Sequence, residues 1–185
     1  NTIGDMLAIK NNGVAKAIYD AHKEGKTVIG ICGGYQMLGE AILDPGHVES
    51  EIEELPGLGL LPVKTVLQPE KTTQQCTFHF RGNEEQCVGY EIHMGRTDAL
   101  HPGEPVATFP DGRRDGYYLD AKTWGTYLHG ILDNQLVIDS ILEPYTREKG
   151  ISYSYQDYKE QQYDKLADLL RANIDMELIY KSIAL

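Results

Sequence analysis

The sequence predicts an α/β domain in which helices flank a central, mostly parallel sheet that carries an antiparallel extension. Near the start, two helical segments, a short apolar strand and a third helix follow one another, as is typical of a parallel sheet covered on both faces. The middle of the chain holds closely spaced short strands between Gly, Pro, Asn and Asp turns, which favour antiparallel pairing. The chain opens in a helix rather than a strand. We therefore expect residues 1–185 to form one N-terminally truncated domain whose first strand is missing.

The first part of the chain is expected to alternate between helices and a strand. Thr2 is the expected N-cap of the first helix and Gly13 its terminator. The second helix is amphipathic and stops at Gly25. In order, we predict a helix over residues 3–12, a helix over 14–23, a strand over 27–31 and a helix over 35–42.

The remainder is predicted to be rich in strands and then helical. Short strands are expected over residues 60–67, 76–80, 87–93, 106–109, 117–121 and 124–128. Helices are expected over residues 136–149, 155–172 and 176–183. In the second of these helices, apolar side chains form a stripe at Tyr163, Leu166, Leu169 and Leu170. The tyrosines just before and within its first turn are expected to serve helix packing.

Bulk composition indicates a cytoplasmic globular protein. Hydrophobic residues make up 41% of the chain and charged residues 24%, which is ordinary for a soluble domain. The net charge of −11 argues against nucleic acid as a partner, because phosphate binding needs Lys and Arg. No apolar run is long enough to cross a membrane, and the N-terminus does not read as a signal peptide. Three cysteines are too few for a disulfide framework, so reduced thiols are expected.

A cysteine at a strand-to-helix turn is the most informative feature of the sequence. The strand over residues 27–31 ends at Cys32, glycines follow, and an apolar-patterned helix begins at once. α/β enzymes hold nucleophiles at such turns. Gly30, Gly33 and Gly34 are expected to supply the unusual backbone dihedral angles that the turn demands. Cys32 then lies at a helix N-terminus, where the helix dipole is expected to lower the pKa of its thiol.

His129 is the best candidate for the base that such a thiol needs in acyl transfer. It ends the predicted strand over residues 124–128 and precedes Gly130, so we expect it at the sheet edge where Cys32 also emerges. The remaining histidines are interpreted as surface residues, apart from His93, which stays a weak candidate. They are His22, His47, His79 and His101. No Cys or His pair has the spacing of metal ligands, and no metal site is predicted.

The elbow resembles that of the class I, triad-type glutamine amidotransferases, which reads Gly-x-Cys-x-Gly-x-Gln. Residues 30–36 match it as Gly-Ile-Cys-Gly-Gly-Tyr-Gln. Three further segments are similar to the cobyric acid synthase family: Pro-Gly-Leu-Gly-Leu-Leu-Pro at 56–62, Gly-Tyr-Glu-Ile-His-Met-Gly-Arg-Thr at 89–97 and Gly-Thr-Tyr-Leu-His-Gly at 125–130. The resemblance spans nearly the whole chain and implies a flavodoxin-like class I glutamine amidotransferase fold.

The resemblance also implies a chemistry. Cys32 is implied to attack the side-chain amide of glutamine and form a thioester, with His129 as the proton carrier. The backbone N–H of Gly33 is implied to donate to the oxyanion hole. A loop just upstream of Asn1 is implied to supply the second donor, and this loop is expected to be cut from the chain.

Two further residues are implied to bind glutamine. Gln36 matches the superfamily residue that contacts the substrate. Arg96 could hold the α-carboxylate as a bidentate fork, and a surface ion pair is the alternative. Glu91 and His93 alternate with apolar neighbours and could face either the site or solvent, so they stay weak candidates.

In the cobyric acid synthase family an ATP-dependent synthetase domain precedes the amidotransferase on the same polypeptide. It uses the ammonia to amidate four peripheral carboxylates of a corrinoid, adenosylcobyrinic acid a,c-diamide, in cobalamin biosynthesis. This chain has no phosphate-cradling Gly-x-x-x-x-Gly-Lys-[Ser/Thr] loop. We therefore expect no cofactor in this chain, and ATP and Mg in the missing synthetase domain.

One position departs from the wider superfamily, and two other functions stay open. The third triad residue of the superfamily, a Glu two residues after the histidine, is Ile131 here, and nothing in the sequence gives Asp133 that role. One alternative function is a glutaminase for another acceptor, such as a cell-wall precursor. The other is a catalytically silent scaffold domain.

Overall fold

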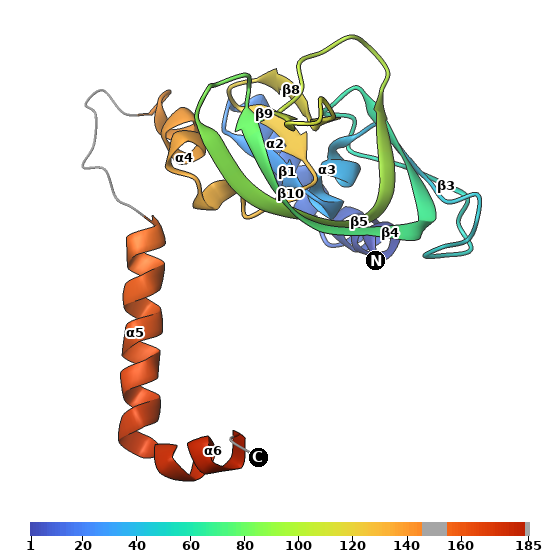
Figure 1. The fold of residues 1–185 in the computed structure, drawn as a ribbon. Coiled ribbons are helices and arrows are strands. Elements are labelled where there is room, and N and C mark those ends of the chain that lie inside the picture. Colours follow the sequence, from blue (N-terminus) through green and yellow to red (C-terminus); the bar gives the residue numbers. More distant parts are fainter. Residues whose placement is uncertain (146–154, 184–185) are drawn as a thin grey trace. The chain divides into compact units, whose positions relative to one another are not determined.

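The structure, a computed structural model, describes residues 1–145 and 155–183, and the chain divides into two compact units. One unit lies within residues 1–148 and the other within residues 149–185. Both sheets belong to the first unit, and two helices form the described part of the second (Figure 1). None of the described helices combines the length and the apolarity that a membrane span requires.

The N-terminal elements follow the prediction, except for the N-cap residue of the first helix and the C-terminal end of the third. They are α1 (Thr2–Asn11), α2 (Val14–Lys23), β1 (Val28–Ile31) and α3 (Gly33–Leu38). Asn1, not Thr2, caps α1, because its side-chain oxygen accepts the N–H of Gly4 at 2.8 Å. The prediction of a helix to residue 42 is wrong: α3 stops at Leu38, and Glu40 donates its N–H to Val63 at 2.8 Å to begin strand pairing.

A three-stranded sheet holds the start of the site. Its order is β1, then β9 (Thr123–Thr126), then β8 (Tyr117–Asp120). β1 and β9 are parallel and β8 and β9 are antiparallel. β1 lies at one edge of this sheet. The carboxyl ends of β1 and β9 therefore point the same way.

The second sheet is larger and mainly antiparallel. Its path is β10-β5-β4-β2-β3, with β6 on β4 and β7 on β6. Only β2 and β4 pair in parallel within it. Its strands are β2 (Ala41–Leu43), β3 (Glu54–Pro56), β4 (Val63–Phe80), β5 (Gln86–Ala99), β6 (Ala107–Thr108), β7 (Arg114–Asp115) and β10 (Leu128–His129). The predicted α/β fold with an antiparallel extension is confirmed, and that extension contains most of the strand pairs.

Two strands are much longer than the sequence predicts. The predicted strands over residues 60–67 and 76–80 are parts of the single strand β4, which continues through a bulge between Leu67 and Thr72. β4 and β5 curve together as one long ribbon, with α3 on the concave side (Figure 1). The polar stretch inside β4 hid this continuity, because its residues are exposed and show no apolar alternation.

The predicted strand over residues 124–128 is divided between the two sheets. Its first part is β9 in the smaller sheet and its last residue begins β10 in the larger one. Tyr127 connects them, and its N–H donates to the buried carboxylate of Asp115 at 3.0 Å. This crossing carries the chain from the partner strand of β1 directly to His129.

Two apolar clusters support the sheets. One lies between α1, α2, α3 and the start of β4, and includes Met6, Tyr35 and Leu61. The other includes Phe78, Trp124 and Ile131. Ile131 is fully buried, so the position of the superfamily's third triad residue belongs to the core of this domain.

The last elements are helical. They are the 3-10 turn η1 (Ile131–Asp133), α4 (Gln135–Leu142), α5 (Tyr155–Asn173) and α6 (Met176–Ile183). α4 stops at Leu142, so the prediction of a helix to residue 149 is wrong over the described residues 143–145, and its end lies outside them. In α5 the predicted apolar stripe is exposed within the described part of the second unit.

Candidate active site

Cys32 connects β1 to α3 in a strained backbone conformation. Its φ of 53° and ψ of −114° lie in a region that residues with a Cβ rarely adopt. The Cys32 N–H donates to the Thr126 carbonyl at 2.8 Å, and the Cys32 carbonyl accepts the Gln36 N–H at 3.2 Å. Hydrogen bonds to β9 and α3 thus keep Cys32 in this strained conformation. The predicted turn from strand to helix at Cys32 is present.

The glycines around Cys32 act through close packing rather than through unusual dihedral angles. Gly30, Gly33 and Gly34 all have ordinary negative φ values, so the expectation that they supply the strained backbone is wrong. A Cβ on Gly30 would lie 2.7 Å from the backbone nitrogen of Tyr35. The missing side chain at Gly30 therefore lets α3 pack directly on β1.

The expected lowering of the Cys32 pKa is also wrong. Burial raises the pKa of the thiol, the N–H of Gly33 lowers it in part, and the carboxylate of Glu49 raises it further. α3 has only six residues, and desolvation of the thiol is the largest cause of the raised pKa. The thiol donates to the carbonyl oxygen of Ile92 at 3.3 Å, which keeps the proton on sulfur.

His129 lies on β10 opposite Tyr90 of β5. The two rings are stacked, with centroids 5.0 Å apart and an angle of 9° between their planes. The His129 Nε2 is buried and has no hydrogen-bond partner among the described residues. A buried imidazole nitrogen in this state can take a proton from a nucleophile brought to it.

The predicted nucleophile and the predicted base both contact the short stretch of β5 from Tyr90 to Ile92. Cys32 reaches the carbonyl of Ile92, and His129 pairs with Tyr90, two residues before it. Thr126, which accepts the Cys32 N–H, is three residues before His129. The crossing from β9 to β10 therefore brings Cys32 and His129 to one edge of β5.

Gln36 is held inside the domain. It is 3% exposed, its Oε1 accepts the Thr2 hydroxyl at 2.7 Å, and its Nε2 donates to the Tyr127 hydroxyl at 3.2 Å. The Tyr127 hydroxyl also shares a hydrogen bond with Thr97 at 2.6 Å. Gln36 thus ties the elbow helix to α1 and to the crossing before β10.

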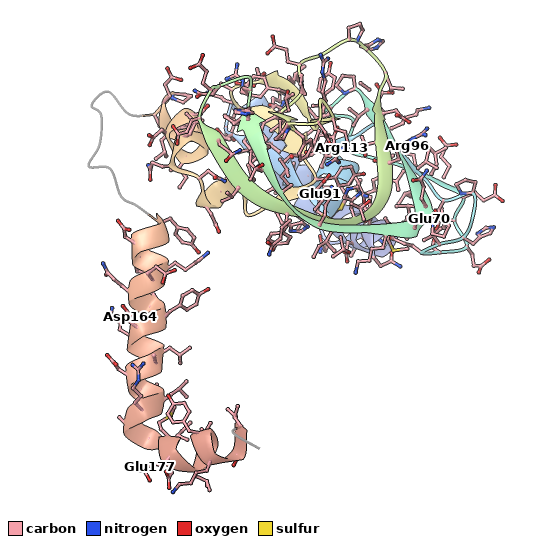
Figure 2. The ribbon with its side chains drawn as sticks, viewed as in Figure 1. Glu70, Glu91, Arg96, Arg113, Asp164 and Glu177 are labelled. Carbon is pink, nitrogen blue, oxygen red and sulfur yellow. The ribbon has the colours of Figure 1, made fainter. Side chains whose placement is uncertain are left out.

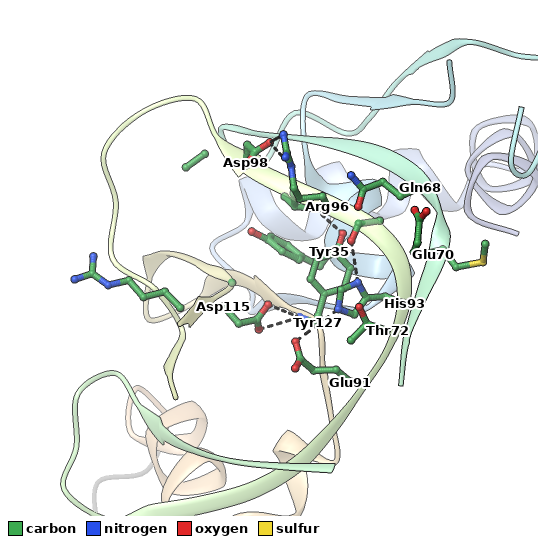
Figure 3. A pocket seen from close by; sticks show the side chains of 16 residues that line it. Tyr35, Gln68, Glu70, Thr72, Glu91, His93, Arg96, Asp98, Asp115 and Tyr127 are labelled. Atoms are coloured by element: carbon green, nitrogen blue, oxygen red, sulfur yellow. Dashed lines mark hydrogen bonds and ion pairs between the residues drawn. The ribbon is translucent and has the colours of Figure 1, made fainter. Parts of the chain in front are cut away.

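Arg96 lies at a polar cavity of about 390 Å³ on the concave side of β5 (Figures 2 and 3). Its guanidinium is largely exposed and pairs with Asp98 at 2.9 Å. The structure thus contains the surface ion pair that we gave as the alternative role of Arg96. A role in glutamine binding stays a prediction.

The same cavity contains buried ionisable groups that converge on Tyr127 (Figure 3). His93 stacks on the Tyr127 ring at 3.8 Å, and its Nε2 lies 3.6 Å from the Glu91 carboxylate. The His93 imidazole is the largest cause lowering the pKa of Glu91; burial opposes it, and Gln74 and Arg113 add to the lowering. Among the described residues, no group of three or more His, Cys, Asp or Glu side chains could hold a metal ion.

Asp115 lies against the crossing from β9 to β10. Its carboxylate accepts the Thr126 hydroxyl and the Tyr127 N–H. Burial raises the pKa of Asp115 to about 6, against the lowering effect of these hydrogen bonds. Asp115 thereby fixes the two residues that link the Cys32 partner strand to β10.

Comparisons with known proteins agree with this geometry. A family model described as the CobB/CobQ-like glutamine amidotransferase domain matches residues 1–137. The chain belongs to this family. A solved glutamine amidotransferase shares 18% identity and a TM-score of 0.50 over 78% of this chain and 72% of its own, which shows the same fold.

Among curated relatives, several are cobyric acid synthases. The enzyme of Bacteroides fragilis is 52% identical over 98% of this chain, and that of Parabacteroides distasonis is 52% identical over 99%. The enzyme of Thermoanaerobacter sp. is 41% identical over 98% of the chain. The chain covers only 37%, 38% and 40% of these three relatives, which are therefore much longer.

Two residues of the amidotransferase domain were not identified from sequence. Asp115 stands in a two-residue strand that composition does not reveal, and it is buried against Thr126 and Tyr127. Tyr127 occupies the crossing between the sheets, which the sequence presents as an uninterrupted strand. The Gly-Thr-Tyr-Leu-His-Gly run carried a signal for Tyr127, since the residue directly precedes the strand of the candidate base.

We expect Asp115→Asn to change how the stability of the domain depends on pH. The carboxyl is harder to ionise in the folded chain, so its favourable contribution is complete below about pH 4 and is lost as pH rises toward about 6. Its contribution to the free energy of unfolding should fall by about 3 kcal/mol over this window. Asparagine can still accept the Tyr127 N–H. Urea unfolding measured from pH 4 to pH 7.5 should show the free energy of unfolding of the variant rising relative to that of the wild type. A difference between the two that does not depend on pH would contradict this account.

Proposed function

We propose that this chain is the glutaminase part of a cobyric acid synthase. It releases ammonia from glutamine for the ATP-dependent amidation of corrinoid side-chain carboxylates. The observation that carries the proposal is the strained Cys32 elbow, which reaches the same stretch of β5 that pairs with His129, in a chain about half identical to cobyric acid synthases over nearly all of its length. The combined match of elbow, β5 segment and histidine segment favours this acceptor over others.

The proposed reaction begins at the Cys32 thiol. His129 Nε2 takes the thiol proton as sulfur attacks the side-chain amide carbon of glutamine, and a C–S bond forms. The imidazolium then gives its proton to the leaving nitrogen as the C–N bond breaks, which releases ammonia. His129 next takes a proton from water as the water oxygen attacks the thioester carbon, and it returns this proton to sulfur as the C–S bond breaks. The products are glutamate and the restored thiol.

Other residues of the elbow support the charge that develops during the attack. The N–H of Gly33, the first residue of α3, is proposed to donate to the oxyanion. Thr2 lies next to Gly33, since a Cβ there would be 3.5 Å from the Thr2 hydroxyl. The chain just before Thr2 is therefore well placed to supply the second donor. Gln36 and Arg96 are proposed to contact glutamine, Arg96 by exchanging Asp98 for the α-carboxylate.

The acceptor chemistry is proposed to reside elsewhere on a longer polypeptide. The relatives exceed this chain by more than half of their own length, which leaves room for an ATP- and Mg-dependent synthetase and a corrinoid site. β1 is an edge strand of its sheet, which is a position where a further strand could pair. A cytoplasmic location is part of the proposal, and the free thiols of Cys32, Cys76 and Cys87 support it.

We expect a glutamine-analogue electrophile, diazo-oxo-norleucine, to label Cys32 in the full-length polypeptide. One adduct on the peptide containing Cys32 should appear by mass spectrometry, and His129→Asn should slow it strongly because the thiol then lacks its base. Glutamine carrying an isotope in its amide should transfer that nitrogen to the corrinoid when ATP is present.

The outcomes separate the alternatives. Labelling of Cys32 without isotope in the corrinoid would indicate a glutaminase for another acceptor. Equal labelling of Cys76, or no release of glutamate by the full-length protein, would favour a silent scaffold domain.

A further inference from the structure

The catalytic histidine has no carboxylate to orient it in the part of the chain that the structure describes. The position two residues beyond it is Ile131, which is fully buried among apolar side chains. The described histidine–carboxylate pairs are those of His47 and His93. In enzymes with a triad, the acid fixes the tautomer and orientation of the imidazole and stabilises the imidazolium. Some other device must hold the His129 ring.

The first part of that device is the ring of Tyr90. It stacks on His129 with nearly parallel planes and 5.0 Å between centroids, and the two residues are direct partners across β5 and β10. Stacking of this kind restricts rotation of the imidazole about its bond to Cβ. An aromatic face also favours a cation placed over it. Tyr90 can therefore fix the ring plane and favour the imidazolium formed when Cys32 loses its proton.

The second part is the side-chain amide of Asn134. Its Oδ1 accepts the Val88 N–H at 2.9 Å, and its Nδ2 donates to the Val88 carbonyl at 2.9 Å. The same Nδ2 donates to the carbonyls of Gly130 at 3.2 Å and Ile131 at 3.0 Å. One side chain thus pairs with β5 as a further strand residue would, and it also holds the turn that follows His129.

We call the four hydrogen bonds of the Asn134 side chain the clamp. Two neighbouring observations indicate that the clamp serves the turn after His129. Asn134 is the N-cap residue of α4, yet its side chain makes no capping hydrogen bond there. The turn it holds is tight: Gly130 has a φ of 71°, and a Cβ on Gly89 would lie 2.8 Å from the His129 carbonyl. Asn134 therefore stabilises the backbone on which the imidazole is mounted, in preference to its own helix.

We propose that Tyr90 and Asn134 position His129 in place of the missing carboxylate. Tyr90 sets the plane of the ring, and Asn134 sets the position of its backbone. Both are positioning residues for the glutaminase reaction, and the inference rests on the function proposed above.

The test compares variants of the full-length polypeptide by glutamate release. Tyr90→Leu should lower kcat about tenfold with little change in KM for glutamine, because a stacking contact is lost while substrate binding is not. Tyr90→Phe keeps the stack and should restore kcat to within about twofold of wild type. Asn134→Asp is nearly isosteric but loses every donated bond of the clamp. It should lower kcat by about 10²-fold through misplacement of the base.

A matched control uses an equally exposed tyrosine. Tyr19 and Tyr90 are both 42% exposed, and Tyr19 lies on α2, so Tyr19→Leu should leave kcat near the wild-type value. Tyr90 is on the surface, so its variants should fold even if Asn134→Asp does not. The labelling rate of Cys32 by diazo-oxo-norleucine should fall in parallel with kcat.

The inference is overturned if Tyr90→Leu keeps the wild-type kcat, or if Tyr90→Phe loses as much as Tyr90→Leu. It is also overturned if Asp133→Asn lowers kcat more than either positioning variant, since an acid would then orient the ring. Failure of the wild-type polypeptide to release glutamate or to label at Cys32 would instead refute the proposed function. The wild-type result therefore tests the function, and the comparison of variants tests the positioning of His129.

Discussion

Replacing Cys32 with serine is expected to remove glutamine-dependent amidation by the full-length polypeptide. The loss should be roughly 10⁴-fold or more, the scale seen when a covalent nucleophile is removed from a hydrolytic site. Serine preserves the size of the side chain and the strained elbow, but its hydroxyl is far less acidic than a thiol and a weaker nucleophile. Amidation driven by added ammonia should continue, because the proposed acceptor chemistry does not use Cys32.

Cys76→Ser is the matched control for this experiment. Cys76 is also a partly buried free thiol, and burial raises its pKa to about 11, so it should be unreactive at neutral pH. Rates with glutamine and with ammonium salts should be measured for both variants. Retained glutamine-dependent activity in Cys32→Ser, or its loss in Cys76→Ser, would contradict the assignment of the nucleophile.

The elements that the sequence predicts well are those whose pattern is local. α2 and α6 have the predicted bounds, since each shows helical periodicity within one short segment. The turn at Cys32 was recognisable because the strand, the cysteine and the glycines are consecutive. The place of His129 at a strand end before Gly130 predicts it as the base, and the resemblance to a known family supports that choice, although the pairing of the distant strands is visible only in the structure.

The elements that were missed depend on tertiary pairing. Residues 41 and 42 are predicted as the end of a helix, but they belong to β2 because β3 and β4 offer partners on both sides. The exposed middle of β4 shows no apolar alternation, so composition could not reveal that the two predicted segments are one strand. Tertiary pairing overrode local propensity in both places.

The electrostatics of the site were the least predictable part. A helix N-terminus suggested a lowered Cys32 pKa, but burial and Glu49 reverse the sign. Only the structure shows that the Ile92 carbonyl accepts a hydrogen bond from the thiol and that His129 Nε2 has no hydrogen-bond partner among the described residues. The sequence predicts which groups react, while the environment that tunes them comes from residues far along the chain.

Gly30→Ala is expected to damage the site strongly although the change is chemically conservative. The added Cβ would lie 2.7 Å from the nitrogen of Tyr35 and 2.8 Å from the carbonyl carbon and oxygen of Gly34. These are backbone atoms of α3, so no rotamer change can relieve the contact. The helix must move away from β1, which should lower the free energy of unfolding by about 3 kcal/mol. Because Cys32 lies between the two elements, glutaminase activity should fall by about 10²-fold or more.

Gly34→Ala adds the same methyl group as Gly30→Ala but should stabilise the domain rather than destabilise it. A Cβ there meets nothing within 4 Å, and its φ is ordinary, so alanine should gain about 0.5–1 kcal/mol in helix stability. Thermal and urea unfolding of the two variants should therefore move in opposite directions from wild type. If both variants were destabilised alike, general sensitivity of α3 would explain the loss. A contrast in sign would instead show that the elbow depends on the contact between the Gly30 backbone and the first turn of α3.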